Sequence, residues 1–263
     1  MVIKMINLKE RKYFYFTQNS LKTFNDCPFR FKKRYIDNIK WDTSSAVNSK
    51  IEFGLDFHKI AERYFLGIPV FEESFKDNEE LYNAYMNLKN HIKLEEQNKY
   101  LPEYTIRFID GDVRLESNID LVVIKPDNCI EIWDFKTNAD LKKGQKYLNS
   151  LQTKIYLYSV RKTLNNILGF STNCAKIKMI YFNPENNVEI AEIYYTEEMF
   201  ENDGKYIKEL IEKVFNYDYS KFDRNNYTKS CEYCEFKLFC DLKPNEDTEV
   251  ALEFNWNEID EFM

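Results

Sequence analysis

The sequence predicts an α/β fold in which a mixed central sheet is covered by helices. Three observations predict it. Apolar residues recur at helical spacing through much of the first hundred residues, two β-rich runs follow, and helical and strand-like segments then alternate. With 263 residues, of which 16% are aromatic, the chain is long enough for one large domain with a sizeable core.

The N-terminal half begins with helices. Residues 13–17 alternate weakly and predict a short strand. Ser20 is a suitable N-cap for a helix that ends at the Cys27-Pro28 step, and a second short helix is expected beyond it. Apolar residues at helical spacing predict an amphipathic helix over 51–66, and a further helix is expected over 77–98.

The central and C-terminal parts supply the strands. Val113–Ile124 and Cys129–Lys136 read as strands joined by the hairpin-like connection Lys125–Asn128. The remaining expected elements are a helix through Leu148–Tyr158, strands near 175–183 and 188–195, a helix near 197–216, and a polar, cysteine-rich loop over 225–240.

Several classes of protein are excluded by what the sequence lacks. No apolar run approaches the roughly 18 residues of a membrane span, and no secretory leader is recognisable, so we expect a cytoplasmic protein without a membrane partner. Neither GxxxxGK[ST] nor GxGxxG occurs, which removes the usual phosphate cradle of ATPases, GTPases and dinucleotide-binding enzymes.

The net charge of −7 is unevenly distributed. Residues 241–263 carry all of it, and residues 1–240 are neutral. Residues 11–40 carry +6 with aromatics interleaved, which fits either a solvated helix face or a surface that follows a nucleic-acid backbone. The acidic tail fits a solvated end, or a segment that docks on a partner or on the chain's own basic surface as a mimic of DNA.

The cysteines predict a metal centre. Six cysteines without a secretory leader argue against a disulfide framework. Cys231, Cys234 and Cys240 form a C-x2-C-x5-C motif, and three thiolates need a fourth ligand from elsewhere in the chain. Cys27, before a proline at a helix break, is the best candidate. Spacing alone leaves both zinc and a cluster of iron and sulfide open.

A second set of residues has the composition of a hydrolytic metal site. Asp134 and Lys136 point to the same face of one expected strand, and Asp120 interrupts an apolar stretch of the preceding strand. Two carboxylates and an ammonium at the centre of a sheet suit Mg²⁺ or Mn²⁺, with the lysine polarising an attacking water. A buried Asp–Lys ion pair without chemistry is the alternative.

Two helices offer further candidates. His58 lies on the 51–66 helix one turn after Gly54, beside the apolar stripe, where a single histidine is more often structural than a ligand. Gln152 and Tyr156 are four residues apart and share one helix face, from which they could contact a substrate backbone.

Taken together, these residues resemble the RecB-like branch of the PD-(D/E)xK nuclease superfamily in its iron–sulfur-containing form. That form includes the AddB nuclease domain and the CRISPR-associated adaptation exonucleases. The resemblance covers residues 20 to 240 and rests on motifs in family order: Ser20-Leu21, Phe24, Cys27-Pro28-Phe29, Gly54-x3-His58, Asp120, Asp134-x-Lys136, Gln152-x3-Tyr156 and Cys231-x2-Cys234-x5-Cys240.

The resemblance implies a restriction-endonuclease-like core in which an Fe–S cluster staples the N-terminal helix to the C-terminal loop. Residues 1–240 would form one nuclease domain, with 241–263 as an acidic tail outside the family pattern. The implied roles are Mn²⁺ or Mg²⁺ ligation by His58, Asp120, Asp134 and the carbonyl of Phe135, water activation by Lys136, support of the lysine and the DNA strand by Gln152 and Tyr156, and 4Fe–4S ligation by Cys27, Cys231, Cys234 and Cys240.

The implied activity is metal-dependent exonuclease cleavage of single-stranded DNA ends, 5′→3′ by analogy, in CRISPR adaptation or in phage or plasmid recombination and repair. Expected partners are DNA and an integrase, helicase or recombinase; a non-catalytic Fe–S DNA-binding or assembly module is the alternative. The family often has glycine two residues before the first motif aspartate. Here Asn118 stands there, which predicts a less tightly bent strand.

Overall fold

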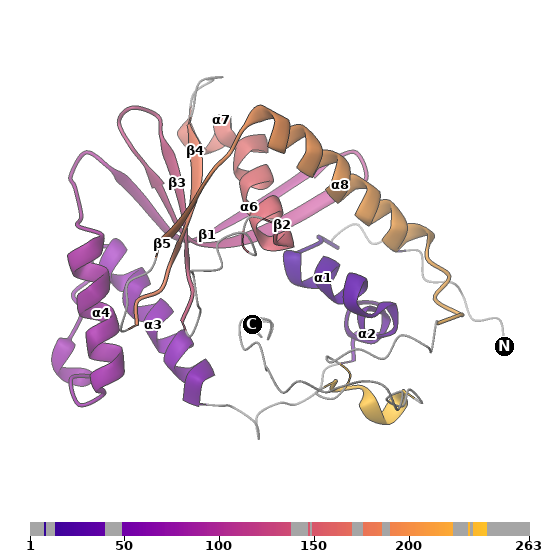
Figure 1. Cartoon of the computed structure of the whole chain (residues 1–263), viewed down its shortest axis with the longest axis horizontal. Coiled ribbons are helices and arrows are strands. Elements are labelled where there is room, and N and C mark those ends of the chain that lie inside the picture. The colour runs from indigo at the N-terminus through magenta and orange to yellow at the C-terminus, as the bar shows by residue number, and fades with distance from the viewer. Residues whose placement is uncertain are drawn as a thin grey trace.

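The expected α/β class is confirmed by the computed structural model, which describes residues 8, 14–39, 49–137, 147, 149–169, 176–185, 190–222, 231 and 234–240. A five-stranded mixed sheet lies between two groups of helices (Figure 1). The strands are β1 (Lys99–Asp110), β2 (Val113–Ile124), β3 (Ile130–Phe135), β4 (Ile177–Phe182) and β5 (Ile190–Tyr194). The longer helices are α1 (Gln18–Asp26), α3 (Ser49–Phe65), α4 (Glu79–His91), α6 (Leu151–Lys162) and α8 (Glu197–Asn216). Shorter helical segments are α2 (Pro28–Phe31), η2 (Lys32–Ile36), η4 (Glu72–Ser74), α7 (Leu164–Leu168) and η7 (Lys237–Phe239).

The strands follow one another across the sheet in chain order. β1, β2 and β3 are antiparallel neighbours, β4 is parallel to β3, and β5 is antiparallel to β4. The parallel β3–β4 pair needs a long crossover, which α6 and α7 provide. The hairpin predicted over Lys125–Asn128 is confirmed: Asn128 adopts a left-handed conformation (φ 63°) and donates its N–H to the Lys125 carbonyl.

Strand β1 is the main element that the sequence analysis missed. The helix expected over 77–98 ends at His91, and Lys99–Asp110 pairs along almost its whole length with β2. Pro102 is tolerated within β1 because this strand lies at the edge of the sheet, where a missing N–H costs no ladder hydrogen bond on the open side.

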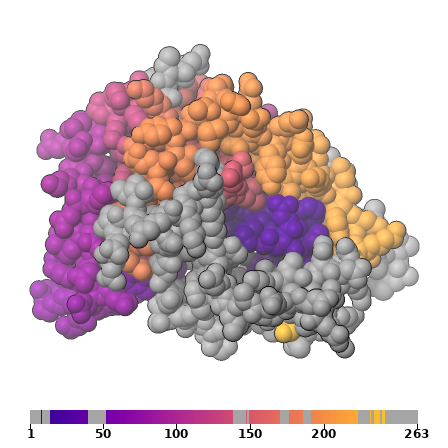
Figure 2. All heavy atoms as spheres, viewed as in Figure 1, coloured from indigo at the N-terminus to yellow at the C-terminus, as the bar shows by residue number. Residues whose placement is uncertain are grey.

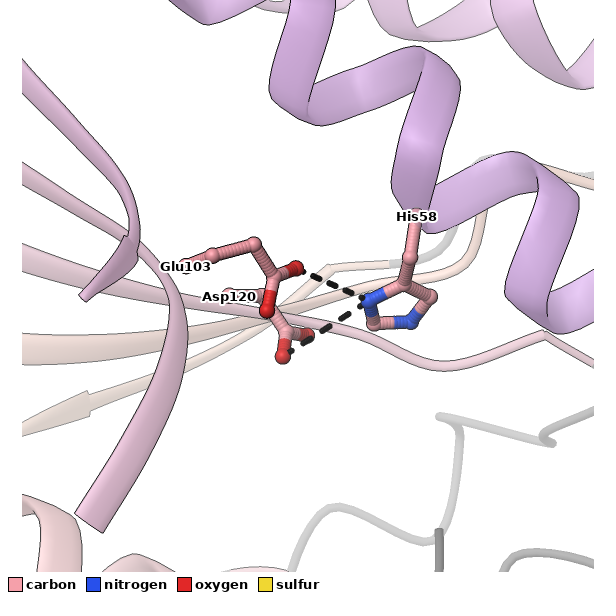
Figure 3. A group of neighbouring side chains, drawn as sticks. All are labelled: His58, Glu103 and Asp120. Carbon is pink, nitrogen blue, oxygen red and sulfur yellow. Dashed lines mark ion pairs between the residues drawn. The ribbon is translucent and has the colours of Figure 1, made fainter. Parts of the chain in front are cut away.

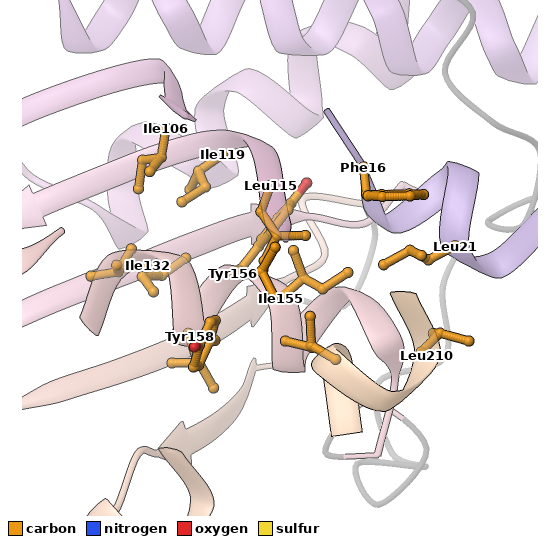
Figure 4. Packing of buried hydrophobic residues seen from close by; sticks show 14 of the residues in the cluster. Phe16, Leu21, Ile106, Leu115, Ile119, Ile132, Ile155, Tyr156, Tyr158 and Leu210 are labelled. Atoms are coloured by element: carbon orange, nitrogen blue, oxygen red, sulfur yellow. The ribbon is translucent and has the colours of Figure 1, made fainter. Parts of the chain in front are cut away.

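Two hydrophobic clusters hold the layers together. The larger packs the sheet against α6, α8 and the N-terminal helices, with Leu115, Ile119, Ile155 and Leu210 among its buried members (Figure 4). The smaller cluster packs α3 and α4 against the opposite face. The sheet is therefore buried on both sides, so a charged side chain within it requires a partner or a function.

The N-terminal segment differs from the expectation in its details. Thr17, and not Ser20, is the N-cap of α1; Ser20 occupies the third helical position and completes a capping box with Thr17. The strand expected over 13–17 is reduced to one bridge between Phe16 and Leu115. The second short helix is confirmed as α2, which continues into η2.

Helix α1 packs beside α8, as the space-filling view shows (Figure 2). The Phe24 ring lies 5.6 Å from the ring of Tyr217, just beyond α8, and 5.6 Å from that of Phe31 in α2. Edge-to-face contacts of this kind fix α1 and α2 against the core.

The basic segment over residues 11–40 is ion-paired where it is described, although it keeps a net positive charge. Lys22 pairs with Asp26, and Lys32 and Lys33 both pair with Asp37. The described lysines of this segment therefore form a solvated, ion-paired helix surface rather than a row of free cations. Arg11, Lys12 and Lys40, and the whole acidic tail 241–263, lie outside the described residues.

Within the part of the chain that the structure describes, no helix combines the length and the apolar character that a membrane crossing requires.

Candidate active site

The centre of the site is an ion pair at the end of β3. Asp134 is the penultimate residue of β3, its side chain is 2% exposed, and its Oδ2 lies 2.8 Å from Lys136 Nζ. Although this ion pair is short, Asp134 Oδ2 is buried and accepts no well-directed hydrogen bond from the described residues. The Lys136 ammonium compensates the negative charge of this buried oxygen. A carboxylate oxygen has further lone pairs, so Asp134 could bind a divalent cation while it keeps the ion pair.

Two side chains hold this ion pair from the α6 and β4 side. Gln152, in the first turn of α6, donates its Nε2–H to Asp134 Oδ1 at 2.6 Å. Tyr181 is the Cα partner of Asp134 in the β3–β4 ladder, and Lys136 Nζ lies 6.0 Å from the centre of its ring. Tyr181 is fully buried and its hydroxyl is 2.6 Å from Thr153 Oγ1, so α6, β3 and β4 are fixed to one another here.

The charge of Lys136 is favoured by this arrangement. Burial opposes the ammonium form, but the carboxylates of Asp134 and Asp120 outweigh it, and the pKa of Lys136 is raised. Burial and the Asp134 carboxylate likewise raise the pKa of Tyr181, which stays a neutral phenol. The backbone N–H of Lys136 donates to the Phe182 carbonyl at 2.9 Å, which fixes the main chain beneath the side chain.

Asp120 reaches the same region from β2. The β2–β3 ladder ends at the Leu121–Trp133 pair, and the strands separate beyond it. Asp120 Oδ2 accepts the Phe135 N–H at 2.6 Å, replacing the ladder bond that the separation removes. The two motif carboxylates thus come from neighbouring strands at the point where those strands diverge.

His58 and Asp120 are joined by an acid that the sequence analysis did not find. His58 Nδ1 on α3 lies 3.8 Å from Asp120 Oδ1 and 3.5 Å from Oε1 of Glu103 on β1 (Figure 3). Within the described residues, this is the one group of three or more potential metal-ligand side chains whose ligand atoms all lie within 4.8 Å of one another. Asp134 is not in that group; its oxygens face Lys136 and Gln152.

Gly54 allows α3 to approach the strand ends. A Cβ at this position would lie 3.3 Å from Thr137 Oγ1, a contact tighter than most, one residue beyond Lys136. The glycine one turn before His58 thus brings the helix close to the residues that follow β3.

Tyr156, the second residue of the predicted α6 pair, lies in the core. It is 4% exposed and packs in the larger cluster among Leu115 and Ile155 (Figure 4). Gln152 therefore faces the ion pair directly, whereas Tyr156 supports the helix that carries it.

Cys27 lies near the C-terminal cysteines despite a separation of about 200 residues in sequence. Burial raises the pKa of its thiol, and the neighbouring Cys231 and Cys240 raise it further. Cys27 also raises the pKa of Cys234, after burial and Glu235. No three sulfur atoms of these described cysteines lie within 4.8 Å of one another.

A charged triad joins the same two segments. Glu235 forms an ion pair with Arg30, whose terminal guanidinium nitrogen lies 2.9 Å from Glu235 Oε2, and a second ion pair with Arg34. These two guanidinium groups outweigh the effect of burial and lower the pKa of Glu235. The C-terminal segment is thus attached to α2 and η2 by ion pairs that do not depend on a bound metal.

Two residues at the site carried no recognisable sequence signal. Glu103 follows a proline in a strand that alternates poorly, and no motif includes it. Tyr181 lies in an apolar run that reads as an ordinary core strand. Only the β1–β2 and β3–β4 registers reveal that these residues lie opposite Asp120 and Asp134.

A mixed sheet whose neighbouring strands present two carboxylates and a lysine beside a helix-borne histidine brings together groups of the kind that metal-assisted hydrolysis uses. The comparisons with known proteins agree with this class. Residues 15–241 match the model of the PD-(D/E)XK nuclease superfamily. The chain belongs to this superfamily and is a nuclease.

Similarity to one solved structure supports the fold, and a second, weaker match is recorded beside it. The crystal structure named "Putative exonuclease" from Eubacterium rectale matches with a TM-score of 0.54 and 13% identity, over 89% of this chain and 92% of that chain. The crystal structure of SSO0001 matches with a TM-score of 0.40 and 15% identity, over 89% of each chain. No curated protein matches the sequence.

Proposed function

We propose that the chain is a divalent-metal-dependent exonuclease that hydrolyses phosphodiester bonds at the ends of single-stranded DNA, with 5′→3′ as the polarity to test first. The observation that carries the proposal is the Asp134–Lys136 ion pair beside Asp120 at the divergence of β2 and β3. A module that only bound DNA would have no need to bury two carboxylates and a lysine together in the sheet.

The proposed metal ligands are His58, Asp120, Asp134 and the backbone carbonyl of Phe135. Mn²⁺ or Mg²⁺ held there would supply Lewis-acid polarisation of the scissile phosphate and of an attacking water. The donor set of one imidazole and two carboxylates fits Mn²⁺ better than it fits Mg²⁺, which prefers oxygen ligands alone.

The protein's own residues orient the reaction. The Lys136 ammonium, held by Asp134, can donate a hydrogen bond to the attacking water and to a phosphate oxygen on which charge develops. Gln152 keeps Asp134 Oδ1 occupied, which leaves Oδ2 directed toward the lysine. Tyr156 supports helix α6 from within the core, and it thereby contributes indirectly to the positions of the DNA strand and of Lys136.

We also propose that Cys27, Cys231, Cys234 and Cys240 hold a structural 4Fe–4S cluster. A tetrahedral zinc site with Zn–S bonds of about 2.3 Å would bring its sulfurs to about 3.8 Å from one another. No three of the described cysteine sulfurs lie within 4.8 Å of one another, so the proposal rests on the motif resemblance and on the approach of Cys27 to the C-terminal cysteines. The cluster would join residues 1–240 into one nuclease domain, closed between α2 and the C-terminal loop.

The biological setting that fits such an enzyme is CRISPR adaptation, or phage or plasmid recombination and repair, in the cytoplasm. These 263 residues contain no P-loop motif, so the motor of any helicase that acts with this nuclease would lie outside them.

The test is anaerobic purification followed by an absorption spectrum and an assay on single strands labelled at either the 5′ or the 3′ end. We expect a brown protein whose visible absorption is that of a 4Fe–4S cluster, and metal-dependent release of label from the 5′-labelled strand as short products. A colourless, iron-free protein that is folded and active would overturn the cluster assignment. A folded, cluster-loaded protein that cleaves neither strand would overturn the nuclease activity on this substrate.

A further inference from the structure

Strand β1 leaves one edge of the sheet open. It is the first strand in the order of the sheet, and among the described strands it pairs only with β2. From Tyr104 to Asp110 every residue has a Cα partner on β2, and none is hydrogen-bonded to a further described main-chain group on the outer side. A regular edge strand presents about half of its N–H and C=O groups outward, where they form a template for another strand.

The devices that usually protect a strand edge do not cover this stretch. Pro102 and Glu103, whose φ is 45°, interrupt β1 before Tyr104, but the ladder from Tyr104 to Asp110 contains neither a proline nor an unpaired position. The strand at the other edge, β5, is only 5 residues long. The edge that most needs a cover is therefore the outer side of Tyr104–Asp110.

The hydrophobic core also stops short at this edge. On β2, Leu115 and Ile119 are fully buried. Their ladder partners on β1, Phe108 and Tyr104, are only partly buried against the larger cluster. The opposite face of the same stretch is exposed and carries Thr105, Arg107 and Ile109. A strand that is apolar on one face and polar on the other would complete the core and keep the second face in water.

The acidic tail contains a segment with this pattern. Residues 249–256 alternate between large apolar side chains and polar or small ones. The apolar set is Val250, Leu252, Phe254 and Trp256, and the other set is Glu249, Ala251, Glu253 and Asn255. A period of two predicts a half-buried strand. In a helix, successive members of the apolar set would stand about 200° apart, so no single face would collect them.

Charge alone is a poor guide to where this segment binds. The described lysines of the N-terminal basic segment already pair with two local carboxylates, Asp26 and Asp37. An acidic tail would have to displace these carboxylates, whereas an apolar face needs only the uncovered edge of the core.

The linker to this segment is long enough to reach the edge. Cys240, the last described residue, lies near Cys27 at the end of α1. Helix α1 has 9 residues, about 14 Å, and leads back to Phe16, which bridges Leu115 on the side of β2 away from β1. Three strand spacings, from Phe16 past β2 and β1 to an added strand, cover about 14 Å more. The linker over residues 241–248 spans up to about 28 Å when it is extended, which matches this path.

We propose that residues 249–256 add to the open edge of β1, along Tyr104–Asp110 of the same chain, as a sixth strand of the sheet. The four large apolar side chains of the segment cover Tyr104 and Phe108, and its glutamates lie on the water-facing side. The tail then completes the fold at its exposed edge, a role separate from the proposed nuclease function.

The test is hydrogen exchange with mass spectrometry on the full-length protein, read from the peptide that covers residues 104–110. Phe254→Asp places a charge on the apolar face of the segment. Asn255→Asp places the same charge one residue away, on the polar face, and is the matched control. We expect the outward amides of 104–110 to exchange at least about tenfold faster in Phe254→Asp than in the wild type, and at the wild-type rate in Asn255→Asp. Unchanged exchange in the peptide of β3 shows that both variants are folded.

Equal exchange of 104–110 in the wild type and Phe254→Asp would overturn the proposal. Equal acceleration in both variants would also overturn it, since charge and not the face of the strand would then control docking. In about 0.5 M NaCl the protection should persist, because main-chain hydrogen bonds and apolar contacts are little screened; its loss would indicate electrostatic docking and contradict strand addition. Protection that rises with protein concentration, together with a dimer in analytical ultracentrifugation, would assign the strand to a second copy and overturn docking within one chain.

Discussion

The charged triad of Arg30, Arg34 and Glu235 makes a quantitative prediction about the C-terminal segment. Glu235 lies between the C-terminal cysteines, and both arginines lie on the helical segment that follows Cys27. Replacing Glu235 with Gln removes the charge and keeps the shape. We expect the segment to detach from α2 and η2 more often, even when no cluster is bound.

The magnitude follows from burial. Breaking a buried ion pair costs about 3–5 kcal/mol, whereas an exposed pair contributes about 0.2–1 kcal/mol. The Glu235 side chain is 10% exposed, and those of Arg30 and Arg34 are 21% and 11% exposed, so the triad lies between these limits. We expect a loss of about 2 kcal/mol, which multiplies the detached fraction by about 30-fold.

Hydrogen exchange measures this fraction directly. In the described segment, the amides of Lys237, Phe239 and Cys240 donate to backbone carbonyls and should be protected while the segment is docked. Mass spectrometry of the peptide spanning 234–240, on protein stripped of iron, should show exchange about 30-fold faster in Glu235→Gln. The control is Asp37→Asn, since Asp37 also pairs with two cations, Lys32 and Lys33, but joins no distant segment.

Equal exchange in Glu235→Gln and the wild type would refute the reasoning, because it would mean that the triad contributes nothing to docking. Equal acceleration in Glu235→Gln and Asp37→Asn would also refute it, since the effect would then come from net charge alone.

Three further predictions concern packing, support and metal. Gly204→Ala would place a Cβ 2.8 Å from Tyr158 Cε2, and the overpacking cost of about 1–3 kcal/mol should outweigh the gain of about 1 kcal/mol in helix propensity. Calorimetry should therefore show a lower Tm, and an unchanged Tm would contradict the close packing of α8 on α6. Gln152→Ala removes the hydrogen-bond donor to Asp134 Oδ1 and should lower the cleavage rate of end-labelled strands about tenfold or more, without changing the visible absorption of the cluster. Full activity would show that this hydrogen bond is dispensable. Brief chelation by EDTA should abolish cleavage while the cluster absorption persists, and Mn²⁺ should restore it; cleavage in excess EDTA would contradict metal dependence.

The layer architecture and the motif positions could be predicted from the sequence because both depend on local patterns. The hairpin between β2 and β3 was marked by Lys125-Pro126-Asp127-Asn128, and the α3 helix by apolar residues at helical spacing. Asp134 and Lys136 share a strand face by parity alone, so their proximity followed from spacing.

The remaining features depend on contacts between distant segments. β1 was missed because Pro102 and an irregular polar pattern conceal a strand that its pairing with β2 stabilises. The left-handed conformation of Glu103 (φ 45°), on the strand beside Asp120, also has no sequence signal. The net charge of residues 11–40 fitted either a solvated helix face or a surface for nucleic acid, and the sequence did not show that Lys32 and Lys33 share one local carboxylate, Asp37.

The central claim is that this chain cleaves DNA with the Asp134–Lys136 pair, and Lys136→Ala tests it most directly. The matched control is Lys154→Ala, which likewise removes a lysine from a buried aspartate, Asp203, but on the α8 side of α6. Cleavage of end-labelled single strands with Mn²⁺ should fall at least about a hundredfold in Lys136→Ala and remain near the wild-type rate in Lys154→Ala, with both proteins folded and cluster-loaded. Wild-type cleavage by Lys136→Ala would contradict the account.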